Sequence, residues 1–145
     1  MSTNYSYLRN TIHKIIKNIK DAKGGDFVDI LAASLILFIM PYEKIYKAGN
    51  KITLDNFDMS KINVTNQGGN LSNDDLFRKL RNGLAHFNIK KKSGAPSTII
   101  IWDENSSGVH FQAEMKYKDF KEFVLHVGDE NLKLLDSLER QGQFN

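Results

Sequence analysis

The segment Phe27–Met40 restricts the fold more than any other part of this chain of 145 residues. Between Ile30 and Met40, only Ser34 interrupts the apolar residues. A membrane-spanning helix needs about 20 such residues, so this run is too short to cross a bilayer. A helix that is apolar on all sides is typical of the buried, central helix of a bundle. We therefore expect a buried helix here, not a membrane anchor, with Pro41 ending or kinking it.

Helical periodicity predicts helices near both ends of the chain. Apolar residues recur at helical spacing over Tyr7–Lys20. Asp119 is expected to begin a further helix, Gly128 to break it, and Leu132–Leu138 to form the last one. The segment Ala48–Asn70 has no clear period, and we expect a long connection containing a short strand or a turn of helix.

A β-hairpin is the only larger sheet element that the sequence predicts. Ser97–Trp102 is rich in Ile and Thr, alternate residues over Val109–Tyr117 are apolar, and Asp103–Gly108 between them is typical of a turn. An isolated hairpin is only marginally stable, so this one needs a partner surface. The expected fold class is therefore mainly α: a compact helical bundle with a β-hairpin insert before the C-terminal helices. The chain length predicts a single domain over residues 1–145.

Composition excludes several functional classes. The net charge of +3 permits an anionic partner without requiring one. The absence of cysteine excludes disulfides, thiolate metal sites and cysteine nucleophiles, and it agrees with an expected location in the cytoplasm. The first residues show no basic segment followed by an apolar one, so we expect no signal peptide. Because no phosphate-binding glycine loop and no paired-histidine spacing occur, we expect neither a cofactor nor a metal ion.

The segment Leu71–Phe87 predicts an amphipathic helix, which Ser72 and Asp75 begin as a capping box would. At 100° per residue, its apolar and polar residues separate into two faces. The apolar face comprises Leu76, Phe77, Leu80, Leu84 and Phe87. The polar face comprises Asp75, Arg78, Lys79, Arg81, Asn82 and His86. Small residues at Gly83 and Ala85 would let another surface approach this polar face.

Within this helix the sequence Arg81-Asn82-Gly83-Leu84-Ala85-His86 resembles the R-x4-H signature of the HEPN superfamily. The resemblance implies a compact helical bundle. It also implies metal-independent endoribonuclease activity, as in many members from toxin–antitoxin, phage-defence and RNA-processing systems. Some members carry, three residues after the His, a Tyr that a partner nucleotidyltransferase modifies. Ile89 stands there in this chain, so regulation by that route is not expected.

The chemistry of RNA cleavage suits the residue types of this motif. RNA carries its own nucleophile, the 2′-hydroxyl, and His86 is a suitable proton-transfer group. Arg81 would stabilise charge on the phosphoryl oxygens, and Asn82 would position His86 or the substrate. Further candidate phosphate contacts are Arg78, Lys79, Lys90, Lys91 and Lys92. The alternative is that these are ordinary surface charges and that His86 merely complements a helix dipole.

One histidine cannot act as base and acid at once, and the resemblance implies a homodimer whose two motif helices face each other. The expected partners are RNA, a second copy of the chain and an antitoxin or other regulatory protein. We therefore predict a metal-independent endoribonuclease of a toxin–antitoxin or phage-defence system. Two alternatives stay open: a non-catalytic HEPN-type module that binds RNA, a nucleotide or a protein, and a purely structural helical subunit.

Overall fold

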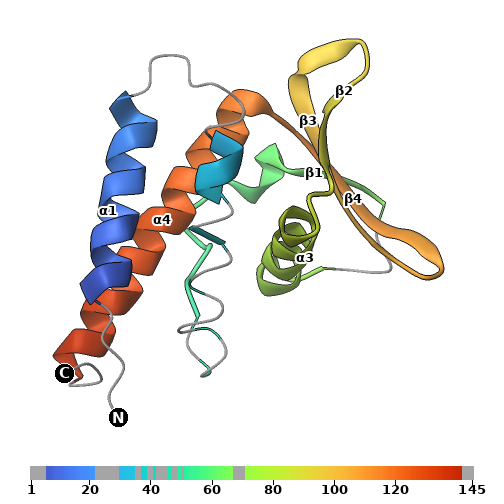
Figure 1. The fold of residues 1–145 in the computed structure, drawn as a ribbon. Helices are drawn as coiled ribbons and strands as arrows, with labels where there is room; N and C mark the ends of the chain where they lie inside the picture. Colours follow the sequence, from blue (N-terminus) through green and yellow to red (C-terminus); the bar gives the residue numbers. More distant parts are fainter. Residues whose placement is uncertain are drawn as a thin grey trace. The chain divides into compact units, whose positions relative to one another are not determined.

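The computed structural model describes residues 6–21, 30–34, 37–38, 41, 46, 49, 51–66 and 71–141 (Figure 1). The chain divides into two compact units. One unit consists of Met1–Thr53 and Val124–Asn145, and the other of Leu54–Phe123. Because two compact units can still be parts of one folding domain, the single domain over residues 1–145 stays a prediction.

The first unit contains α1 (Ser6–Asp21) and most of the long helix α4 (Tyr117–Arg140). The two helices lie side by side (Figure 1), and the guanidinium of Arg9 bridges them. Its Nη2 lies 3.1 Å from a carboxylate oxygen of Asp136 and 2.7 Å from one of Glu139. The helix predicted over residues 7–20 is thus confirmed. Its buried residues are Leu8, Ile12, Ile16 and Ile19.

The apolar segment is helical wherever the structure describes it, and all of its described residues except Ala32 are buried. Residues 30–34 and 37–38 are helical, and Leu37 and Phe38 are fully buried. The side chain of the buried Asn131 in α4 donates a hydrogen bond of 2.9 Å to the carbonyl oxygen of Leu37 and accepts one from the hydroxyl of Tyr46. The rest of the predicted helix lies outside the described residues. Pro41 is itself helical and buried, but its neighbours on both sides are not described, so the expected end or kink there stays a prediction.

The predicted break at Gly128 is wrong, because α4 is one continuous helix. A Cβ on Gly128 would lie 2.9 Å from Cδ1 of Ile16 and 3.3 Å from Cδ1 of Leu37. The lack of a side chain therefore allows α4 to pack closely against its neighbours in this unit. Gly128 costs the helix about 1 kcal/mol of propensity relative to Ala, and the packing outweighs that cost.

The second unit is built on a four-stranded antiparallel sheet with the order β1–β4–β3–β2. The strands are β1 (Asn63–Asn66), β2 (Ile89–Lys92), β3 (Ala95–Asn105) and β4 (Gly108–Lys116). The predicted hairpin is confirmed as β3 and β4, but each of its edges pairs with a further strand. The prediction of a mainly α-helical bundle with only a hairpin insert is therefore wrong, and the fold is α+β.

The remaining elements of this unit are η2 (Met59–Lys61) and α3 (Asn73–Ala85). The long connection predicted over residues 48–70 thus contains one turn of helix and the short strand β1. Helix α3 lies against the sheet (Figure 1), and Ile99, Ile101 and Phe111 of the sheet are buried. Edge-to-face ring contacts connect Phe123, in the first part of α4, with Phe77 of α3 and with Phe57.

Candidate functional site

Helix α3 carries the motif, and its start is the one that the sequence predicts. Ser72 is the N-cap, and its hydroxyl accepts a hydrogen bond of 3.1 Å from the backbone N–H of Asp75. Asp74 and Asp75 lie in the first turn, where the helix dipole favours negative charge. The predicted apolar face is confirmed over four of its five residues, which are buried: Leu76, Phe77, Leu80 and Leu84.

The helix ends two residues earlier than predicted, and His86 is its C-cap. The N–H of Phe87 donates to the carbonyl of Leu84 at 3.0 Å, and the N–H of Asn88 donates to that of Gly83 at 2.7 Å. These two bonds form a Schellman motif with Phe87 in its left-handed position, at φ 62°. The prediction that Phe87 belongs to the buried face is wrong, because its side chain is 61% exposed.

Arg81 and Asn82 lie near the C-terminal end of α3, and His86 is its C-cap. Arg81 is partly buried, and its guanidinium carbon is 5.8 Å from the centre of the Phe77 ring. The backbone carbonyl of Asn82 accepts from the N–H of His86 at 3.1 Å, which places the two residues one helical turn apart. The His86 side chain is exposed and hence open to a ligand. A histidine at a helix C-terminus also complements the dipole, as the alternative interpretation holds.

The sequence suggested that Gly83 lets another surface approach the polar face of α3, but the structure places it against the sheet. A Cβ at this position would lie 2.5 Å from the backbone oxygen of Trp102 and 2.9 Å from Cγ2 of Ile101, both in β3. Gly83 therefore permits close packing of α3 on the sheet of its own chain. Ala85 is exposed and is the small residue that stays open to another surface.

Four of the five predicted phosphate contacts have described partners, two in ion pairs and two beside aromatic rings. Nη2 of Arg78 lies 3.5 Å from Asp75, and Nζ of Lys92 lies 2.7 Å from Glu114. The ammonium of Lys90 lies 5.4 Å from the centre of the Trp102 ring. Lys91 is exposed, whereas Lys79 is partly buried, with its ammonium 6.0 Å from the centre of the Phe111 ring. Their contact with RNA stays a prediction.

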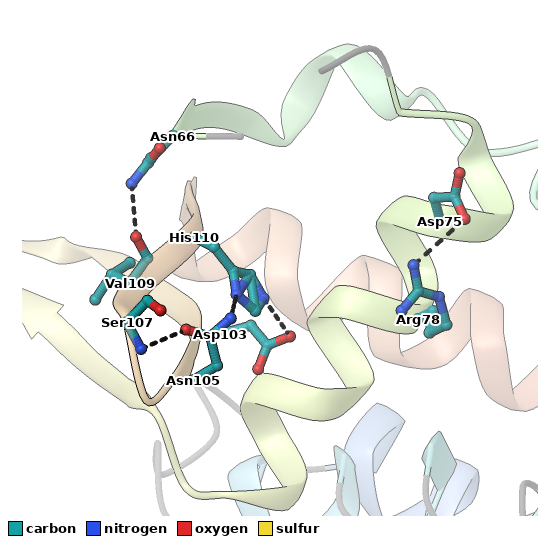
Figure 2. A network of polar contacts seen from close by, with 8 residues as sticks. All are labelled: Asn66, Asp75, Arg78, Asp103, Asn105, Ser107, Val109 and His110. Carbon is teal, nitrogen blue, oxygen red and sulfur yellow. Dashed lines mark hydrogen bonds and ion pairs between the residues drawn. The ribbon is translucent and has the colours of Figure 1, made fainter. Parts of the chain in front are cut away.

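The structure shows a polar cluster around His110 that sequence reasoning missed (Figure 2). Asp103 pairs with Phe111 and Glu104 with Val109, so His110 is the extra residue of a β-bulge. Its Nε2 lies 3.0 Å from Oδ2 of the buried Asp103. A regular alternation of faces would have separated these side chains, and a bulge re-aims one of them.

The His110 cluster stabilises the hairpin and is a poor candidate for proton transfer. In the tautomer that satisfies both contacts, Nε2–H donates to Asp103 and Nδ1 accepts from Nδ2 of Asn105 at 3.2 Å. Because both ring nitrogens are engaged, neither is available to a substrate. The oxygen of Asn105 also accepts from the N–H of Ser107 at 2.8 Å, which ties the cluster to the turn.

Comparison with known proteins assigns the family. The family model described as HEPN pEK499 p136 matches residues 1–132. The chain belongs to the HEPN superfamily. No curated protein and no solved structure matches the chain. HEPN domains are often ribonucleases or nucleotide-binding modules, so the family agrees with the residues at the end of α3 without deciding between these activities.

Three further findings describe this HEPN protein. In the part of the chain that the structure describes, no group of three His, Cys, Asp or Glu side chains is placed to hold a metal ion. None of the described helices has the length and hydropathy needed to cross a membrane. Ile89, at the position of the modified Tyr of other members, is the first residue of β2 and pairs with Ile101.

Proposed function

We propose that this HEPN protein is a metal-independent endoribonuclease that uses Arg81, Asn82 and His86. The observation that supports it best is the end of α3, where the family motif presents an exposed imidazole one turn after Asn82. On its other side the same helix packs against the sheet at Gly83 and against Phe123 of α4 at Phe77. The packing of the apolar side of α3 therefore holds the residues of its polar side in place.

The reaction would proceed by attack of the RNA 2′-hydroxyl on the adjacent phosphorus. A base takes the hydroxyl proton as the new P–O bond forms, and an acid donates a proton to the 5′ oxygen as its bond to phosphorus breaks. The products are a 2′,3′-cyclic phosphate and a 5′-hydroxyl. His86 performs the proton transfer, and the planar guanidinium of Arg81 stabilises the charge on the non-bridging oxygens. Asn82 positions His86 or the substrate.

The complete site consists of two chains. One imidazole cannot be base and acid in the same step, and a two-fold interface would bring two copies of His86 into one cleft. The exposed Ala85 is compatible with close approach of the second chain. A ribonuclease of this kind fits a toxin–antitoxin or phage-defence system of the cytoplasm, where an antitoxin or other regulatory protein would restrain it.

Cleavage of RNA in the presence of a chelator is the direct test. The wild-type chain should cleave single-stranded RNA in EDTA and leave a cyclic phosphate. It should not cleave the same oligonucleotide with a 2′-deoxy substitution at the scissile position. Activity that is lost in EDTA and restored by magnesium would contradict the mechanism. Binding of the oligonucleotide without cleavage would favour a non-catalytic HEPN-type module instead.

A further inference from the structure

Phe87, which directly follows His86, combines two unfavourable features. Its φ of 62° lies in the left-handed region, and it is the only residue other than glycine with a positive φ in the part of the chain that the structure describes. Its side chain is 61% exposed although it is large and apolar. Glycine is the usual residue at this position of a Schellman motif because a Cβ is strained there.

Because most of its surface is exposed, the Phe87 side chain adds little buried apolar area to the fold in return. An apolar contact often accompanies a Schellman motif. It joins the side chains of the two residues whose backbones form the longer of its hydrogen-bonded loops, which here are Gly83 and Asn88. Neither offers an apolar side chain for such a contact. A bulky residue in a strained backbone conformation is a reason to look for function at that site.

The backbone around Phe87 is nonetheless firmly held. Two hydrogen bonds close the end of α3, and the carbonyl of Asn88 accepts a third, of 3.1 Å, from the N–H of Trp102 in β3. The three residues Ala85, His86 and Phe87 are consecutive and all exposed. The backbone that carries the aromatic ring is therefore held in place, directly after the His86 of the proposed site.

We infer that Phe87 is a stacking platform for an unpaired RNA base beside the phosphate on which His86 acts. This inference rests on the proposed function and names its substrate class, single-stranded RNA. Protein aromatic rings stack on exposed bases, and the contact tolerates any base because each has a π-face. Bases within a duplex are already stacked on one another and so cannot use this platform. An exposed ring on a preorganised bend suits this contact because the protein backbone does not have to be ordered on binding.

The test is RNA affinity, measured in full-length chains that also carry His86→Ala so that the oligonucleotide survives. Fluorescence anisotropy with a short, labelled, single-stranded RNA compares Phe87→Gly, Phe87→Trp and the unaltered Phe87. Glycine should weaken binding roughly tenfold, as loss of one stacked base does, and tryptophan should retain the affinity. Tyr7→Ala, which removes another exposed aromatic ring on α1, is the matched control and should leave the affinity unchanged.

The possible outcomes separate this inference from the proposed function. Phe87→Gly should not lower the melting temperature, because glycine relieves the backbone strain. Equal RNA affinity with and without the ring would overturn the stacking role alone and leave the ribonuclease proposal standing. Conversion of a dimer to a monomer by Phe87→Gly, measured by light scattering, would assign the ring to a contact between chains and also overturn it. Failure of the chain that keeps Phe87 to bind RNA, together with failure of the wild-type chain to cleave it, would overturn both.

Discussion

At Gly83 the absence of a single methyl group decides how closely α3 can pack on the sheet. A Cβ there would lie 2.5 Å from the carbonyl oxygen of Trp102, and a backbone oxygen within β3 cannot move aside as the end of a side chain can. Alanine would gain about 1 kcal/mol of helix propensity and lose more than that by steric overlap.

We therefore expect Gly83→Ala to lower the free energy of unfolding by about 1–2 kcal/mol in urea denaturation. The exposed neighbour provides a control, since Ala85→Ser should change the free energy by less than about 0.5 kcal/mol. A stabilised Gly83→Ala chain would mean that α3 and β3 are further apart than described.

Single residues also show where sequence reasoning succeeds. Ser72 was predictable as a cap because its hydroxyl reaches a donor three residues away, a purely local interaction. Phe87 was placed wrongly because a helical projection assumes that the helix continues, whereas α3 ends at Ala85. The bulge at His110 had no sequence signal, since it depends on the register between two strands.

At the scale of elements, the long hairpin was predictable and the two short strands were not. The strand β3 is rich in Ile and Thr, β4 alternates between apolar and polar residues, and a turn sequence separates them. By contrast, β1 (NVTN) and β2 (IKKK) are four residues each and mostly polar, and their conformation is imposed by pairing with the hairpin. Gly128 looked like a helix breaker because its packing against Ile16 is not local.

The buried side chain of Asn131 connects α4 to the apolar segment and permits a test at this scale. Asn131→Ala removes the donor to the Leu37 carbonyl and the acceptor of the Tyr46 hydroxyl. Leaving buried partners unsatisfied costs about 1–3 kcal/mol, so the urea midpoint should fall clearly. The exposed Asp129→Ala, on the same helix, controls for the change in helix propensity. Equal midpoints for the two variants would contradict the described connection.

At the scale of the whole molecule, the proposed two-chain site predicts how activity depends on subunit composition. In equal mixtures of wild-type and His86→Ala chains, random exchange leaves about a quarter of dimers with two histidines. If acid and base come from opposite chains, the initial rate falls with the square of the wild-type fraction. A linear decline, with exchange confirmed by mass spectrometry, would show that the two histidines do not act together.

The central claim is that His86 of this HEPN protein transfers protons during RNA cleavage without a metal ion. Its most direct test is the cleavage rate of single-stranded RNA in EDTA for His86→Ala, with His13→Ala, an exposed histidine on α1, as the control. We predict a loss of roughly 100-fold or more for His86→Ala and none for His13→Ala, with unchanged melting temperatures. Retained cleavage by the His86→Ala chain, or an equal loss in both variants, would contradict the account.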